Sequence, residues 1–75
     1  SWWKRFFSPQ RRADKLMKRG LAYVEVGRTE EAFEIVGQLQ ALRYSGAFEI
    51  EAQALAREGR KSEAIEVLRK GLELA

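Results

Sequence analysis

The chain has 75 residues, of which 45% are hydrophobic and 33% charged, a composition that supports one small globular domain with a modest core. It contains no histidine and no cysteine, which excludes disulfides and thiolate chemistry and removes the commonest general base of enzymes. The net charge of +3 is uneven: residues 1–20 carry a balance of +6, and residues 21–75 carry −3. We therefore expect a non-catalytic protein without cofactor or metal, whose basic beginning and acidic remainder face different surroundings.

Residues 1–8 form an aromatic and basic segment, which we separate from a helical domain at residues 9–75. On a helix, its aromatic side chains fall on one side and its two basic side chains on the other, a layout typical of helices that seek an interface. The segment comprises Trp2, Trp3, Lys4, Arg5, Phe6 and Phe7. We expect the aromatic side chains to pack on the chain's own domain, because a tethered surface is present at high effective concentration. A membrane surface or a partner protein is the alternative.

Nucleic acid is a third candidate partner, because basic residues interleaved with aromatic residues pair phosphates and stack bases. We expect it not to bind. We interpret the basic residues after the aromatic segment as spread around their helix, and the rest of the domain is acidic. These residues are Arg11, Arg12, Lys15, Lys18 and Arg19.

The first predicted helix spans residues 9–26. Ser8 before Pro9 is a helix start signal, since serine caps free amide groups and proline at the first position loses no hydrogen bond. Gly27 ends this helix, and Thr29 begins the second, with Glu30 and Glu31 placed at the positive end of its dipole.

The second half of the chain predicts two more helices. Ser45 and Gly46 separate the second helix from the third, and Gly59 ends the third. Ser62 is the predicted cap of the fourth helix. The predicted buried side chains of this fourth helix are Ala64, Ile65, Leu68 and Leu72.

An internal repeat organises these helices. The stretch GRTEEAFEIV at residues 27–36 returns as GRKSEAIEVL at residues 59–68, and the alignment predicts repeats at about residues 13–44 and 45–75. Such a period is typical of stacked helical hairpins, each of which buries its apolar face on its neighbour. The identical pairs are Ala22/Ala54, Gly27/Gly59, Arg28/Arg60, Glu31/Glu63, Ala32/Ala64, Glu34/Glu66 and Leu42/Leu74.

This pattern resembles the tetratricopeptide repeat family, an all-α fold of antiparallel helix–turn–helix units. The small residues, Gly20 with Ala52 and Ala32 with Ala64, allow close helix approach, and large residues fill the space beside them. A generic antiparallel bundle is the alternative. The matching residues are Leu16, Gly20, Tyr23, Gly27, Ala32, Val36 and Leu39 in the first repeat, and Phe48, Ala52, Leu55, Gly59, Ala64, Leu68 and Gly71 in the second.

The resemblance implies a scaffold that binds a protein or peptide in a groove lined by the first helix of each repeat. Its apolar half suits one face of a partner helix or, as the alternative, the N-terminal aromatic segment. The family's chaperone-tail receptors use lysine and asparagine where this chain has other residues, so we do not expect that ligand. The groove residues are Met17, Leu21, Val24 and Glu25 from the first repeat, and Glu49, Gln53, Ala56 and Arg57 from the second.

The last helix of such an array is expected to expose an apolar face that favours association, because every internal hairpin presents an apolar face to the next. Leu68, Leu72 and Leu74 should have an uncovered side, which further repeats or a homo-oligomer through the C-terminal helix would cover. No apolar run reaches the length of a membrane-spanning helix, and no signal peptide is recognised. We expect a cytoplasmic, bacterial-type protein, peripheral to the membrane if the aromatic segment inserts.

Overall fold

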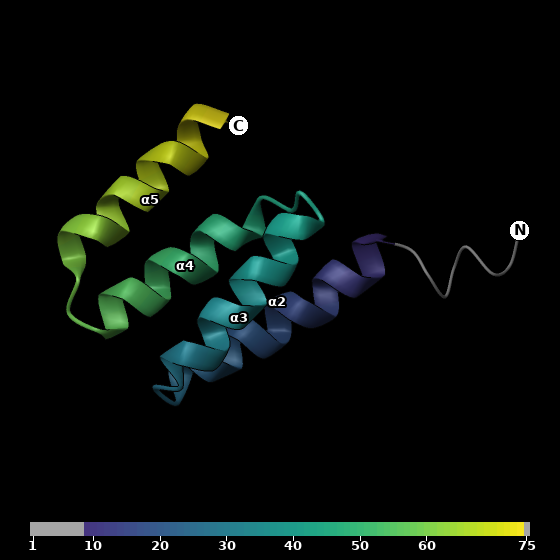
Figure 1. Ribbon diagram of the computed structural model, residues 1–75, viewed down its shortest axis with the longest axis horizontal. Coiled ribbons are helices and arrows are strands. Elements are labelled where there is room, and N and C mark those ends of the chain that lie inside the picture. The colour runs from purple at the N-terminus through teal and green to yellow at the C-terminus, as the bar shows by residue number, and fades with distance from the viewer. Residues whose placement is uncertain (1–8, 75) are drawn as a thin grey trace, which may run out of the picture.

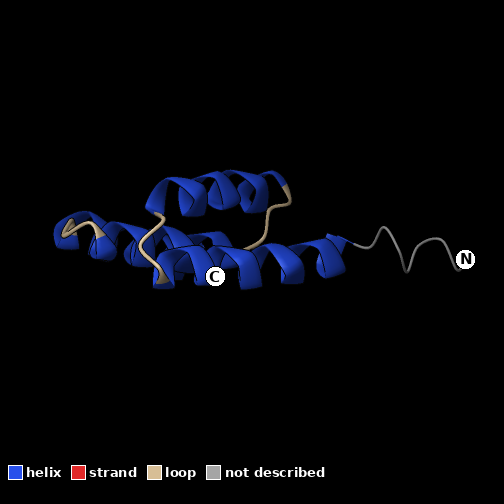
Figure 2. Ribbon diagram, turned by 90° about the horizontal axis from the view of Figure 1, so that it is seen from below, coloured by secondary structure: helices blue, strands red, loops and turns tan. Residues whose placement is uncertain are grey.

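The computed structural model describes residues 9–74, and within these residues every regular element is a helix. Four helices follow one another and pack in consecutive, antiparallel fashion, with α2 also resting on α4 (Figure 1). This arrangement confirms the all-α prediction for the described part of the chain. The helices are α2 (Pro9–Glu25), α3 (Thr29–Ala41), α4 (Gly46–Arg57) and α5 (Lys61–Leu74). The loops that join α3 to α2 and to α4 are visible in the turned view (Figure 2).

The two repeated turns have the same backbone geometry. Gly27 has a φ of +80° and Gly59 a φ of +81°, the left-handed conformation that glycine adopts without a steric penalty. After each glycine, the amide of the arginine donates to a carbonyl five residues back, from Arg28 to Tyr23 at 2.8 Å and from Arg60 to Leu55 at 2.9 Å. This pattern is the Schellman motif, and it confirms the predicted helix ends at both glycines.

The turn between α3 and α4 has the same motif with a different residue. Arg43 has a φ of +55°, and the amide of Tyr44 donates to the carbonyl of Leu39 at 3.0 Å. The predicted break at Ser45 and Gly46 therefore begins earlier, with the left-handed residue at position 43. Ser45 precedes α4 but makes no side-chain capping bond.

The predicted cap of the last helix is wrong. Ser62 lies inside α5, which begins at Lys61, so Arg60 is the residue that precedes the helix. The amide of Ala64 donates to the carbonyl of Arg60 at 3.0 Å, just as Ala32 donates to Arg28 at 3.1 Å in the first repeat. The shared turn thus sets the start of both second helices.

The core lies where α2, α3 and α4 meet, and Leu39 and Ile50 are its largest fully buried side chains. Gly20 brings the three helices together: a Cβ atom there would lie 3.0 Å from Cγ2 of Ile35 and 3.2 Å from Cγ2 of Ile50. The predicted close approach at the small residues is therefore confirmed at this position. The remaining buried residues of this core are Ala13, Leu16, Val24, Ala32, Val36, Ala47 and Ala54.

The packing of α5 differs from the prediction. Ala64 is buried, and Val67 is partly buried against Ala52 and Leu55 of α4. Gly71 lies directly over Phe48, since a Cβ atom on this glycine would be 3.0 Å from Cγ of the ring. Three residues predicted to be buried face outward instead, because α4 covers only one side of the helix. They are Ile65, Leu68 and Leu72, with exposed fractions of 60%, 48% and 78%.

Candidate interaction surfaces

The residues predicted to line a groove lie on α2 and α4, which are in contact. Near one end of the pair, Nη2 of Arg57 donates to the backbone carbonyl of Glu25 at 3.4 Å. Along α4, the side-chain amide Nε2 of Gln53 donates to Oε1 of Glu49 at 3.4 Å. The structure therefore brings the two halves of the predicted set side by side.

The apolar half of this groove is smaller than predicted. Val24 is 8% exposed and belongs to the core, so its assignment to the groove is wrong. Met17 is partly buried against the same core. Leu21, at 36% exposed, is the large apolar residue of the set that reaches the surface most, and the surrounding residues are exposed and largely polar. These exposed neighbours are Glu25, Glu49, Gln53, Ala56 and Arg57.

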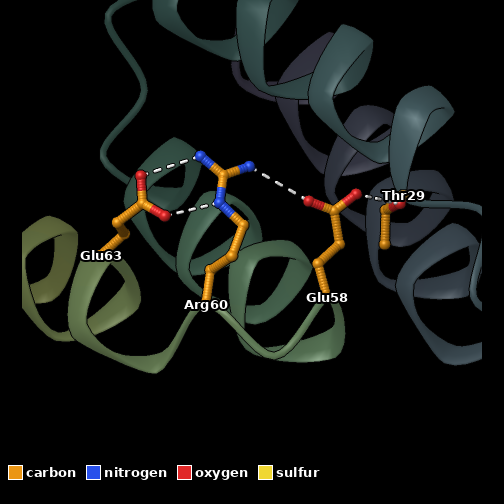
Figure 3. Close-up of polar contacts among 4 residues, drawn as sticks. All are labelled: Thr29, Glu58, Arg60 and Glu63. Atoms are coloured by element: carbon orange, nitrogen blue, oxygen red, sulfur yellow. Dashed lines mark hydrogen bonds and ion pairs between the residues drawn. The ribbon is translucent and has the colours of Figure 1, made fainter.

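Polar side chains join the two glycine turns (Figure 3). Oγ1 of Thr29 donates to Glu58 at 2.8 Å, and the other oxygen of Glu58 pairs with Arg60 at 3.1 Å. Arg60 also donates two hydrogen bonds to Glu63, at 2.5 and 2.8 Å. The bonds to Glu63 and then to Glu58 raise the pKa of Arg60, and the bond from Arg60 lowers the pKa of Glu63. This network is structural: each carboxylate is already paired.

The first repeat holds the same ion pair without the added glutamate. Nε of Arg28 donates to Glu31 at 2.6 Å, as Nε of Arg60 does to Glu63. The backbone amide of Glu31 itself, followed by the bond from Arg28, lowers the pKa of this carboxylate. The guanidinium carbon Cζ of Arg28 also lies over the Tyr23 ring, 5.5 Å from its centroid. The arginine and glutamate that recur in the two repeats therefore form ion pairs beside the glycine turns, and their role there is structural.

The basic residues of α2 lie on one side of the helix, which we call the basic face of α2. The interpretation that they are spread around the helix is wrong. At 3.6 residues per turn, they occupy about a third of the circumference, opposite the buried side of the helix. The spacings of three, four and seven residues already carried this signal. The basic face consists of Arg11, Arg12, Lys15, Lys18 and Arg19, all exposed.

The outward residues Ile65, Leu68 and Leu72 form a second surface, the apolar stripe of α5. They lie three, four and seven residues apart, so they share one side of the helix. The prediction that Leu68, Leu72 and Leu74 have an uncovered side is confirmed, with Leu74 at 76% exposed. Leu74 lies apart from the stripe, where it lines a shallow cleft with Tyr44 and Phe48 that the sequence did not predict.

The repeat explains why the apolar stripe is exposed. By the offset between the repeats, Leu68 of α5 corresponds to Val36 of α3, which is 4% exposed. Ile65 likewise corresponds to Phe33, which packs on the α4 residues Ala52 and Leu55. A following helix covers these positions on α3. On α5 the described residues provide no such helix.

Residues 1–8 lie outside the described part of the chain, so the predicted contacts of the aromatic segment stay predictions. Comparison of the sequence and the structure with protein-family models, curated proteins and solved structures gives no match.

Proposed function

We propose that this chain is a non-catalytic protein-interaction module of tetratricopeptide-like type, whose apolar stripe on α5 receives a helix of a partner. The observation that carries the proposal is the contrast between Val36, which α4 helps to bury, and the equivalent Leu68, which is 48% exposed. Large apolar side chains gathered on one exposed helix face are typical of interfaces.

The way α4 sits on α3 indicates the kind of partner. Phe33 of α3 packs against the buried cluster that Ala52 and Leu55 of α4 form with Ala64. A partner helix with apolar residues three and four apart would meet Ile65 and Leu68 in the same way. This is the helix-in-groove mode of recognition, in which residues three and four apart anchor the bound helix.

Site-specific photocrosslinking tests the proposal. We place p-benzoylphenylalanine at position 72 in cells and compare it with the same probe at position 26. Leu72 and Val26 are both apolar and well exposed, at 78% and 67%, but Val26 lies outside the apolar stripe. We expect a discrete crosslinked product from position 72 alone. Equal or absent crosslinking at the two positions would reject the proposal.

The basic face of α2 supports a second candidate function, attachment to an anionic membrane surface. Five exposed cations on one helix face follow a segment with four aromatic residues and two further cations in the sequence. Basic clusters gain about 1 kcal/mol per residue near anionic lipid. Among residues 9–74, no helix is long and apolar enough to cross a bilayer.

Vesicle co-sedimentation tests this second function. We expect the chain to bind vesicles that contain phosphatidylserine and to remain free with phosphatidylcholine alone. Deleting residues 1–7 and, separately, changing Lys15 and Lys18 to glutamate should each weaken binding. The matched control changes Arg69 and Lys70 of α5 to glutamate, which alters the net charge equally and should weaken binding less. Binding that responds equally to both charge reversals would argue against a role for the basic face.

A further inference from the structure

We propose that the helix received by the apolar stripe is the α5 helix of a second copy of this chain, in an antiparallel and symmetric contact. The inference rests on the proposed function, in which the apolar stripe is an interface. It adds the identity of the helix that binds the apolar stripe. A second copy could offer two surfaces to the apolar stripe, its α2 helix or its own apolar stripe.

The first surface is α2, which would occupy on α5 the place that α4 has on α3. Ala47 and Ile50 of α4 face the preceding hairpin and are 4% and 0% exposed. By the offset between the repeats, the equivalent residues of α2 are Lys15 and Lys18, both exposed. Burying two unpaired ammonium groups against leucine is strongly unfavourable. Head-to-tail stacking of copies is therefore disfavoured.

The second surface is the apolar stripe of another α5. Its helix carries as many acidic as basic residues, so two copies do not repel one another. The part before Leu68 has a balance of −1, and the part after it has +1. Antiparallel pairing therefore places opposite charges and opposite helix dipoles together. The charged residues are Lys61, Glu63 and Glu66 in the first part, and Arg69, Lys70 and Glu73 in the second.

The size of the contact sets its strength. The 14 residues of α5 span about 21 Å, and one helix pair buries less than the roughly 1,000 Å² of a stable interface. We therefore expect a weak, reversible dimer, with a dissociation constant of about 10 μM to 1 mM. Closed two-fold symmetry limits the assembly to two copies.

Sedimentation equilibrium of the intact gene product from micromolar to millimolar concentration tests the association. We expect a monomer–dimer equilibrium. Ile65→Lys and Leu72→Lys together should weaken it at least tenfold, while the helices persist because both side chains are already exposed. Val26→Lys is the matched control and should leave the dimer unchanged.

Disulfide crosslinking tests the orientation, because the chain has no cysteine of its own. In an antiparallel contact, Leu68→Cys should crosslink to itself, and a mixture of Ile65→Cys and Leu72→Cys should crosslink faster than either variant alone. Faster self-crosslinking of Ile65→Cys and Leu72→Cys would indicate parallel helices and overturn the proposed contact.

Three further outcomes would overturn the inference. They are a strict monomer at millimolar concentration, assembly beyond a dimer, and a dimer that responds to Lys15→Glu and not to the stripe variants. If the chain is a monomer but the probe at position 72 still crosslinks to a different protein, the second copy is wrong and the proposed function stands. If position 72 crosslinks to nothing, both fail.

Discussion

Thr29 and Glu58 lie in different hairpins, and the 2.8 Å hydrogen bond between their side chains ties the first glycine turn to the second. Glu58 also accepts from Arg60, so this one carboxylate fixes the end of α4 relative to the starts of α3 and α5. The bond joins residues 29 positions apart, and it stabilises the stacking of the hairpins.

A double-mutant cycle measures that coupling. We expect Thr29→Val and Glu58→Ala to share a coupling free energy of about 0.5–1 kcal/mol, the range for a partly exposed bond to a charged group. Urea unfolding followed by circular dichroism supplies the values. The control pair is Glu66 and Arg69, which are 3.8 Å apart and exposed, so their coupling should be near zero. Equal couplings for the two pairs would mean that Thr29 does not stabilise the stacking.

The three left-handed turn residues predict opposite effects of glycine and alanine. Gly27→Ala and Gly59→Ala should each lower the free energy of unfolding by about 1 kcal/mol, because alanine resists a positive φ. Arg43→Gly should raise it by about 0.5–1 kcal/mol, since glycine relieves the same strain at φ +55°. Arg43→Ala is the control for loss of the arginine side chain. Chemical denaturation ranks the variants, and a destabilised Arg43→Gly would contradict the argument.

Replacing two helical glycines with alanine should have opposite effects on stability, because the glycines differ in packing. Gly37 lies exposed in α3, and a Cβ atom there would meet nothing within 4 Å. Gly37→Ala should therefore stabilise the protein by about 1 kcal/mol through helix propensity alone. Gly20→Ala makes the same change against Ile35 and Ile50, whose branched side chains have little room to move, and we expect it to destabilise. Melting temperatures of both variants provide the check, and a shift of the same sign in both would refute the packing argument.

Acid should weaken the turns through Glu31 and Glu63. Both have a folded-state pKa below the ordinary value of 4.5, so their stabilising contribution is complete above that value. It is lost as the pH falls through the lower folded-state values, because protonation removes the pairing with Arg28 and Arg60. Denaturation midpoints at pH 6, 4 and 3 should fall less steeply in Glu31→Gln and Glu63→Gln than in the parent. Glu34→Gln, an exposed carboxylate of α3, is the control and should follow the parent.

The helices and two of their turns were predictable because their signals are local. A glycine that follows a run of helical residues supplies the left-handed conformation within a few bonds of the helix end, and Gly27 and Gly59 both do so. The start of α3 at Thr29 was likewise predicted from the sequence. Ser62 was misread as a cap because the repeated turn, rather than the serine, sets the start of α5. No local signal marks Arg43, since arginine rarely adopts a positive φ.

The candidate surfaces depended on which helix covers which side. Periodicity marks the apolar side of a helix, but an apolar side chain is buried only where a neighbour lies against it. Val24, predicted to line the groove, is buried in the core, whereas Leu68 and Leu72 remain 48% and 78% exposed. The sequence by itself determined an all-α chain of repeated hairpins, because backbone hydrogen bonds and turn conformations form between residues close in the chain. Only the tertiary structure decided which apolar and basic faces remain exposed, because burial depends on contacts between residues far apart in it.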